Sequence, residues 1–360
     1  MRTRMSTTRL SRSRRHLSAA AAFVVIGAPA LEGQRTEEFE LPGREVAVYN
    51  LAGEVRIVQG RGSNVVVRVT LLGPDAQTLD VEVGQVGGSQ ALRVIYPEDR
   101  IIYPELGRGS RTTVSVRSDG TFYGGGRSRG DRVEVRGSGR GLEAHANLEI
   151  EVPAGTEFSL YLAVGQTDIR GVSGDFIIDT GAGEVVAQDI QGSLRVDTGS
   201  GHVSVRGVEG DVLVDTGSGS VEVEDIRGGE INVDTGSGRV TGRRLSATSV
   251  RVDTGSGRIE LDEVTSEDVS LDTGSGSIRV EILSDVENLD IDTGSGSVTV
   301  WLPEIAGAEL EIETGNGGIE LDFPVQIRRA GRDHVIGTIG DGRGRIHIDT
   351  GSGSIRLARR

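Results

Sequence analysis

The chain has 360 residues, a formal net charge of −15, 55 glycines, no cysteine and only 3% aromatic residues. The lack of cysteine excludes disulfides, thiolate nucleophiles and thiolate metal sites, and because all 39 basic residues are arginine, a P-loop lysine and Schiff-base chemistry are excluded too. With so few aromatic rings, we expect a thin core of small branched side chains.

Residues 1–30 predict a signal peptide. The segment MRTRMSTTRLSRSRRH carries six arginines and no acid, the apolar run LSAAAAFVVIGA follows it, and Ala28-Pro29-Ala30 fits a cleavage site. Its removal would take away six positive charges and change the formal charge from −15 to −21, which disfavours binding to nucleic acid. No later apolar run is long enough to predict an integral membrane segment. We therefore expect an exported protein that is periplasmic, outer-surface or extracellular.

Residues 36–160 predict an irregular N-terminal β cap region. The stretch VAVYNLAGEVRIVQG mimics one repeat, and NVVVRVTLL, TLDVEV, ALRVIYP and NLEIEVP are further strand candidates. An Arg/Gly-rich insertion, residues 108–141, has eight arginines against three acids. We expect a mobile hairpin or loop there, and contact with an anionic partner is the alternative.

Residues 161–358 are periodic and predict a β-solenoid repeat domain. A motif that most often reads DTGSG recurs at intervals of 18–21 residues, followed by one interval of 36 residues. Apolar residues alternate on both sides of it, which indicates strand, turn and strand, and its two glycines suit a turn with positive φ. The motif begins at Asp179, Asp197, Asp215, Asp234, Asp253, Asp272, Asp292, Glu313 and Asp349.

These units predict an all-β fold, a single-chain parallel β-solenoid similar to a β-helix. It would contain roughly 9–10 coils of 18–21 residues, stacked about 4.8 Å apart around a ribbon of valine and isoleucine. The 36-residue interval predicts that one coil near residue 331 has lost its motif or is looped out.

The tetrapeptide DTGS also occurs in aspartic peptidases, whose site needs two aspartates that face each other and share a proton. Here the aspartates would form a line along one edge of the rod, where Asp, Thr and Ser act as turn formers. Carboxylates about 4.8 Å apart repel by roughly 0.9 kcal/mol in water, so calcium bound along this edge is an alternative. The candidate ligands are Asp197, Asp215, Asp234, Asp253, Asp272 and Asp292. No catalytic residue and no cofactor is predicted.

The DTGSGSV coils, the lead-in LEIEVPAGTEFSLYLAVGQTDIRGVSGDF and the closing GTIGDGRGRIHIDTGSGSIRL together resemble the bacterial putative adhesin family. This family is a β-strand-repeat domain of unknown function in exported or envelope-associated proteins. The resemblance runs from about residue 36 to 358. It implies a β-solenoid and no catalytic residues, and the insertion at 108–141 departs from it.

These observations predict a non-enzymatic exported β-solenoid that is an adhesin-like surface module or a structural or binding module. Its expected partner is an envelope protein or a polysaccharide, and no nucleic acid. Two alternatives stay open. One is a polysaccharide-active β-helix enzyme, which the uniform coil length and the single tryptophan, Trp301, disfavour. The other is a protein-binding scaffold at the envelope, which the sequence does not separate from adhesion.

Overall fold

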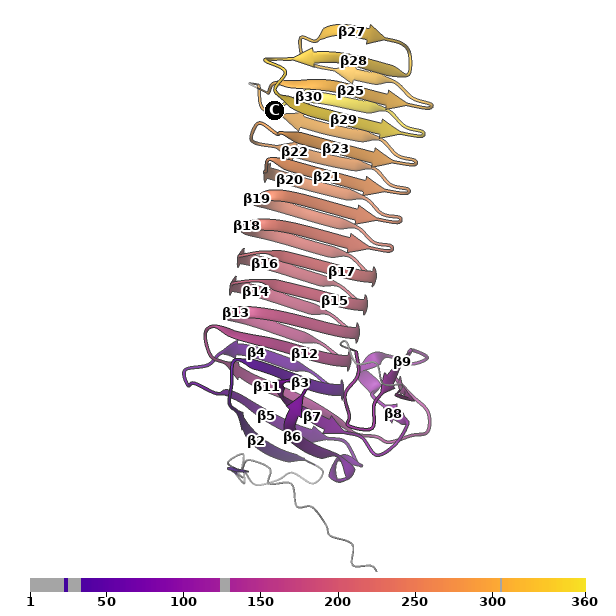
Figure 1. The fold of residues 1–360 in the computed structure, drawn as a ribbon. Coiled ribbons are helices and arrows are strands. Elements are labelled where there is room, and N and C mark those ends of the chain that lie inside the picture. The colour runs from indigo at the N-terminus through magenta and orange to yellow at the C-terminus, as the bar shows by residue number, and fades with distance from the viewer. Residues whose placement is uncertain (1–22, 25–33, 124–129, 305) are drawn as a thin grey trace, which may run out of the picture.

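Alternating apolar residues form the wall of a long rod of stacked coils (Figure 1). The computed structural model describes residues 23–24, 34–123, 130–304 and 306–360. Strands run across the rod, and parallel pairing between successive coils joins them into one continuous sheet around the core. The predicted all-β fold, a parallel β-solenoid, is confirmed.

Most of the predicted signal peptide, residues 1–30, lies outside the described residues. Of that segment, the structure places only β1 (Phe23–Val24), which pairs antiparallel with β2 (Arg35–Leu41). The signal peptide therefore stays a prediction.

Two strands joined at the DTGSG turn make one coil, as β15 (Leu194–Ser200) and β16 (Val203–Glu209) illustrate. Strand β15 pairs in parallel with β17 (Val212–Ser218), and β16 pairs in parallel with the first half of β18 (Val221–Thr235). The repeat interval thus brings each residue beside its counterpart in the next coil. The other strands of the regular coils are β13 (Thr167–Ala182), β14 (Val185–Gln191), β19 (Val240–Thr254), β20 (Ile259–Thr265), β21 (Asp268–Thr273), β22 (Ile278–Ile282), β23 (Asn288–Thr293) and β24 (Val298–Leu302).

The core is a narrow column of aliphatic side chains. The inward-facing, buried residues of the coil formed by β15 and β16 are Leu194, Val196, Thr198, Val203, Val205 and Val208. Neighbouring coils bury the equivalent positions, so the column is continuous along the rod. Each fully buried Val, Leu or Ile side chain contributes about 1.5–3 kcal/mol, and stacking alone makes that burial complete.

A bend within the second strand of six successive coils is made by one residue in the left-handed conformation. In β16 this residue is Gly207, with a φ of 67°, and the buried Val205 and Val208 on either side of it both point into the core. Pairing between coils skips this residue, passing from Arg206 directly to Val208. Because the partner strand skips its own equivalent residue, the register is kept and the strand turns around the core without a loop. The equivalent residues of neighbouring coils are Gly171, Asp189, Asp225, Arg244 and Glu263.

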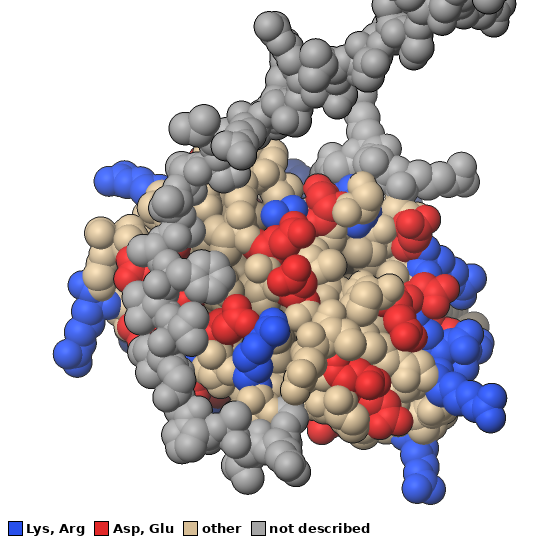
Figure 2. Space-filling model, turned by 90° about the horizontal axis from the view of Figure 1, so that it is seen from below, with Lys and Arg blue, Asp and Glu red and all other residues tan. Residues whose placement is uncertain are grey.

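The N-terminal end of the rod combines parallel coils with antiparallel strands. Its elements are β3 (Glu45–Ala52), β4 (Val55–Gln59), β5 (Val65–Leu72), the short 3-10 helix η1 (Ala76–Thr78), β6 (Asp80–Val86), β7 (Ser89–Ile95), β11 (His145–Val152) and β12 (Thr156–Val164). Strands β3 and β4 form a coil that pairs in parallel with β12 and β13. Beyond it, β5 pairs antiparallel with β2 and with β11, and β6 pairs antiparallel with β7. Acidic and basic side chains are interspersed over this end (Figure 2). Charged side chains on terminal strands oppose edge-to-edge association.

A small sheet stands beside the N-terminal part of the rod (Figure 1). It contains β8 (Arg100–Ile102), β9 (Arg111–Val116) and β10 (Asp131–Arg136), with η2 (Pro104–Leu106) between the first two. Strand β10 lies in the middle, parallel to β8 and antiparallel to β9. The described part of the segment 108–141, where a mobile hairpin or loop is expected, contains the antiparallel pair β9 and β10, to which β8 adds a third strand. The strands form because TTVSV and RVEV alternate with period two and bury Val114, Val133 and Val135.

At the C-terminal end, the spatial order of the strands departs from their order along the chain. The elements are β25 (Ala308–Thr314), β26 (Ile319–Leu321), β27 (Gln326–Ala330), β28 (His334–Ile339), β29 (Gly344–Thr350) and β30 (Ile355–Arg359). Strand β29 lies between β23 and β25, and β30 lies between β24 and β26. Strands β27 and β28 form an antiparallel hairpin on β25. The predicted coil near residue 331 is thus a terminal hairpin, because an antiparallel return carries no DTGSG turn.

Candidate functional site

The DTGSG turn places its aspartate outside the rod and its threonine inside. Thr198 and its counterparts in other coils are buried. In several coils the threonine hydroxyl donates a hydrogen bond to the carbonyl of the fifth motif residue in the neighbouring coil. Examples are Thr273 to Gly257 at 3.1 Å and Thr293 to Gly276 at 3.0 Å. In these coils the bond satisfies a hydroxyl that is buried between strands, whereas the hydroxyls of Thr180 and Thr216 are buried without a partner.

The two glycines of the motif are required by the stacking of the coils. A Cβ on Gly201 would lie 1.8 Å from the carbonyl oxygen of Gly183, and one on Gly199 would lie 2.6 Å from that of Gly181. Gly201 also has a positive φ of 146°, as predicted from the sequence. Gly199 does not have a positive φ, so the prediction is wrong for the third motif position. There the close approach of the backbones excludes a side chain.

The motif carboxylates form a ladder along one edge of the rod. Asp179 pairs in register with Asp197, and Asp197 with Asp215. The in-register series continues through Asp234, Asp253, Asp272, Asp292, Asp349 and Glu313. The aspartates lie side by side on successive coils. The two facing aspartates of an aspartic peptidase are therefore not formed by this ladder.

The predicted calcium ligands share one edge but do not surround a point. Over the described residues, no group of three or more His, Asp or Glu side chains could hold a metal ion. In a straight ladder each carboxylate has only the carboxylates above and below it as neighbours, whereas calcium takes six to eight oxygen ligands. The six candidates, Asp197, Asp215, Asp234, Asp253, Asp272 and Asp292, thus keep a calcium role only as a sequence-based hypothesis.

The first two aspartates of the ladder differ from the others in burial. The pKa of Asp179 is raised to about 7, mainly by burial and to a smaller extent by the charge of Asp197, while Arg195 acts in the opposite direction. Burial also raises the pKa of Asp197, with a contribution from Asp215. Ionising these two side chains at neutral pH therefore costs free energy.

The inserted sheet causes this burial, because its strand β9 and Tyr123 stand over the start of the ladder. Between them lies a groove of about 820 Å³. One side is formed by Asp179, Gly181 and Asp197 of the ladder. The facing side includes Thr112, Ser115, Arg117 and Tyr123 of the insertion. Carboxylates, hydroxyls, a phenol and a guanidinium thus converge on one hollow, which suits a polar ligand.

Local hydrogen bonds fix the insertion side of the groove. The Arg117 guanidinium donates to the carbonyl of Tyr123 at 3.0 Å and to the hydroxyl of Thr121 at 2.7 Å. The Thr121 hydroxyl donates to Asp119 at 2.6 Å. Burial acts to raise the pKa of Asp119, but the bonds from Thr121 and the charge of Arg117 bring it below its usual value. Burial, with smaller contributions from Asp179 and Asp197, raises the pKa of Tyr123 to about 12. Its phenol is therefore a neutral hydrogen-bonding group in this groove.

Aromatic contacts anchor the insertion on the rod. The ring of Phe122 lies 5.1 Å from that of Tyr123 and 5.8 Å from that of Tyr49. Tyr49 in turn stacks on Tyr161 at 4.5 Å. Sequence reasoning named Asp197 but missed Asp179, Arg117 and Tyr123. The sequence did contain an indication of an aromatic cluster in this region, since all five tyrosines lie between residues 49 and 161.

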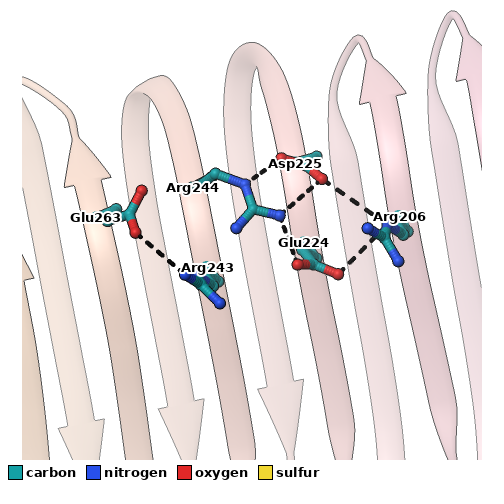
Figure 3. A network of polar contacts seen from close by, with 6 residues as sticks. All are labelled: Arg206, Glu224, Asp225, Arg243, Arg244 and Glu263. Atoms are coloured by element: carbon teal, nitrogen blue, oxygen red, sulfur yellow. Dashed lines mark hydrogen bonds and ion pairs between the residues drawn. The ribbon is translucent and has the colours of Figure 1, made fainter.

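A second polar ladder follows the bend of the coils (Figure 3). Arg244 donates to Asp225 at 2.9 Å and to Glu224 at 2.5 Å, and Arg206 lies 3.3 Å from Glu224 on the other side. Arg243 continues the series to Glu263 at 3.5 Å. The hydrogen bonds from Arg244 hold the pKa of Asp225 below its usual value. Charges of opposite sign thus alternate between coils here, which marks this surface as structural.

Solved structures similar to this chain include three from bacteria. A putative cell adhesion protein from Clostridium sporogenes is 11% identical, with a TM-score of 0.19, and the match covers 91% of this chain and 100% of that one. A putative lipid binding protein from Parabacteroides distasonis is 15% identical, with a TM-score of 0.39 and coverage of 91% and 97%. A putative adhesin from the same organism is 13% identical, with a TM-score of 0.34 and coverage of 91% and 98%.

No curated protein matches the chain significantly. Among the residues that the structure describes, no helix is long and apolar enough to cross a membrane. The family model Toastrack DUF4097, a domain of unknown function, matches residues 142–358, which is more than half of the chain and includes the DTGSG coils. The chain therefore belongs to the Toastrack DUF4097 family.

Proposed function

We propose that this protein is an exported, non-enzymatic binding module of the cell envelope, and that it binds its partner in the groove between the inserted sheet and the aspartate ladder. The observation that carries the proposal is the convergence of Asp179, Asp197, Arg117 and Tyr123 on that groove. Regular coils present the same side chains repeatedly, whereas this groove combines groups from two parts of the chain. Binding sites commonly occur where such a scaffold is interrupted.

Export is proposed from the first 30 residues. A basic start, an apolar run and a small-residue cleavage pattern are typical of a secretory signal. The test is the mass of the protein recovered from the periplasm, the outer surface and the culture medium. Cleavage near Ala30 is expected, and a full-length protein confined to the cytoplasm would contradict export.

The expected partner is an envelope protein or an envelope polysaccharide, as the adhesin-like resemblance implies. The test is a pull-down from envelope extract with the wild-type chain and with Thr112→Arg, which places a long side chain at the groove. We expect the substitution to reduce capture severalfold. The matched control is Thr299→Arg on β24, an outward position of similar exposure far along the rod. Equal capture by wild type and both variants would contradict binding in the groove.

A second candidate, a polysaccharide-active enzyme, is favoured by one observation. Asp179, with its pKa raised to about 7, and Asp197 are neighbouring carboxylates whose pKa values could separate an acid from a base. Against it, the two carboxylates lie in one row instead of on opposite sides of a groove. Hydrolysis of acidic polysaccharides by the wild-type chain, abolished in both Asp179→Asn and Asp197→Asn, would favour the enzyme over the binding module.

A further inference from the structure

The last coil of the chain occupies a position inside the rod and not at its end. After β24 ends at Leu302, the chain leaves one coil position open and builds β25 and β26 beyond it. It then forms the β27–β28 hairpin, turns back, and fills the open position with β29 and β30. We call this position, which residues 344–360 fill, the C-terminal slot.

The segment in the slot connects the terminal coil to the rest of the rod. Asp349 pairs in register with Asp292 on one side and with Glu313 on the other. The Thr350 hydroxyl donates to the carbonyl of Gly296 at 3.0 Å. From the opposite side, the Thr314 hydroxyl donates to the carbonyl of Gly353 at 2.8 Å. Its inward side chains are fully buried: Ile346, Ile348, Ile355 and Leu357. Every contact of a regular coil is therefore made on both faces of the segment.

A short connector, residues 340–343, joins the hairpin to the slot. Ala308 pairs with Ile339 on one side of β25 and with Gly344 on the other. The connector must therefore cross two strand spacings, about 9.6 Å. It passes directly over Gly307, where an added Cβ would lie 2.2 Å from a carboxylate oxygen of Asp341. Gly340 and Gly342 both have positive φ, 54° and 72°. The crossing is thus short and conformationally constrained.

We propose that the C-terminal slot is an interface for a second copy of this chain, which inserts its own residues 344–360, so that two copies exchange their last coils. The contacts within the slot are the same whether the segment comes from its own chain or from another. Only the connector differs between the closed monomer and the exchanged dimer, and short constrained connectors favour exchange. The dimer would present two grooves and so bind its partner at two sites. That consequence rests on the proposed binding function, whereas the exchange itself does not.

The chain has no cysteine, so single cysteines can report the exchange. Thr299 of β24 and Arg356 of β30 are outward residues in register across the slot. In-register parallel neighbours about 4.8 Å apart are within the Cα separation of a disulfide. Full-length Thr299→Cys and Arg356→Cys chains, carrying different tags, are unfolded together, refolded at high protein concentration and oxidised. A disulfide between the two tagged chains is expected, because β30 of one copy enters the slot of the other.

The matched control is a mixture of Glu260→Cys and Arg279→Cys chains. These residues are also outward and in register on neighbouring coils, but they lie where coil order follows chain order. Deleting Asp341 and Gly342 should raise the yield of linked dimer severalfold. Three Cα–Cα steps then remain between β28 and β29, and they span at most about 11 Å in a straight line, so the shortened connector cannot pass around Gly307. Inserting four flexible residues into the connector should lower the yield. The proposal would be overturned if the yield of linked dimer were no higher than in the control mixture, both with the natural connector and with the shortened one.

Discussion

The two polar edges of the rod have the same spacing and opposite electrostatics. Along the turn edge, Asp179, Asp197 and Asp215 place like charges beside one another. Along the bend edge, Arg244 lies between carboxylates of the neighbouring coil, as Figure 3 shows. In a parallel solenoid the residue at a given coil position always meets its own counterpart. An exact repeat therefore places like charges together, and only variation between coils can alternate them.

The reason for the difference lies in what each edge demands of the backbone. At the turn, the inward threonine and the two close-packed glycines can be replaced by few residues, and the aspartate recurs with them. At the bend, the only requirement is a left-handed residue, which glycine meets most easily but Asp225, Arg244 and Glu263 also meet. The charge at the bend can therefore vary from coil to coil. Ionisation of the bend carboxylates favours folding, whereas ionisation of the buried aspartates at the start of the turn ladder opposes it.

The largest predicted effect compares a glycine from each edge. In Gly201→Ala the new Cβ would meet the backbone of Gly183 at 1.8 Å, so neighbouring coils must separate, and we expect a loss of more than about 3 kcal/mol. In Gly207→Ala the nearest atom is the side-chain oxygen of Asp189 at 2.8 Å, which can move, and the left-handed backbone costs about 1 kcal/mol. Urea unfolding measures both. Equal losses would show that stacking does not determine the motif glycines.

A smaller effect concerns pH, and its sign is opposite at the two edges. The pKa of Asp179 is raised to about 7, so its stabilising contribution is complete below about pH 4 and is lost as pH rises through 7. Asp179→Asn should therefore raise the melting temperature at pH 8 relative to wild type and change it little at pH 4. The pKa of Asp225 is lowered, so its contribution is present at neutral pH and is lost on acidification.

Asp225→Asn is the matched variant for this test. It should lower the melting temperature at pH 7 and converge with wild type as the pH falls below the usual aspartate range. Thermal unfolding of the three proteins from about pH 2 to pH 8 measures both curves. If Asp179→Asn and Asp225→Asn shifted the melting temperature in the same direction at pH 8, the contrast between the two edges would be contradicted.

The smallest expected effect comes from the exposed ion pairs of the bend. Arg244→Ala leaves Asp225 and Glu224 without their main partner, and should lower the melting temperature slightly at low ionic strength. The difference should shrink as salt is added, because exposed charges are screened. Asp253→Ala, which removes one charge of the turn ladder, should respond to salt in the opposite direction, since it relieves repulsion. The same salt dependence in both variants would argue against this assignment.

Much of the fold was predictable because the physical requirements of a coil are local. Alternation around LRVDT and HVSV identified the strands, and the interval between motifs identified the coil length. The candidate site was only partly predictable. Asp197 was found through its motif, but the groove depends on Arg117 and Tyr123, about 60 residues or more from the ladder in sequence. The Arg/Gly-rich composition also obscured the strands of the insertion.

The sequence by itself determined the length of each coil and which side chains face the core, because both follow from spacing along the chain. Only the tertiary structure decided which coils are neighbours and which aspartate is buried. Any DTGSG coil fits against any other, so the motif at Asp349 is equally compatible with a terminal position or with the one it occupies between Asp292 and Glu313. Likewise, Asp179 and Asp253 begin nearly the same motif, DTGAG and DTGSG, and they differ in burial because a distant segment stands over the first and not the second.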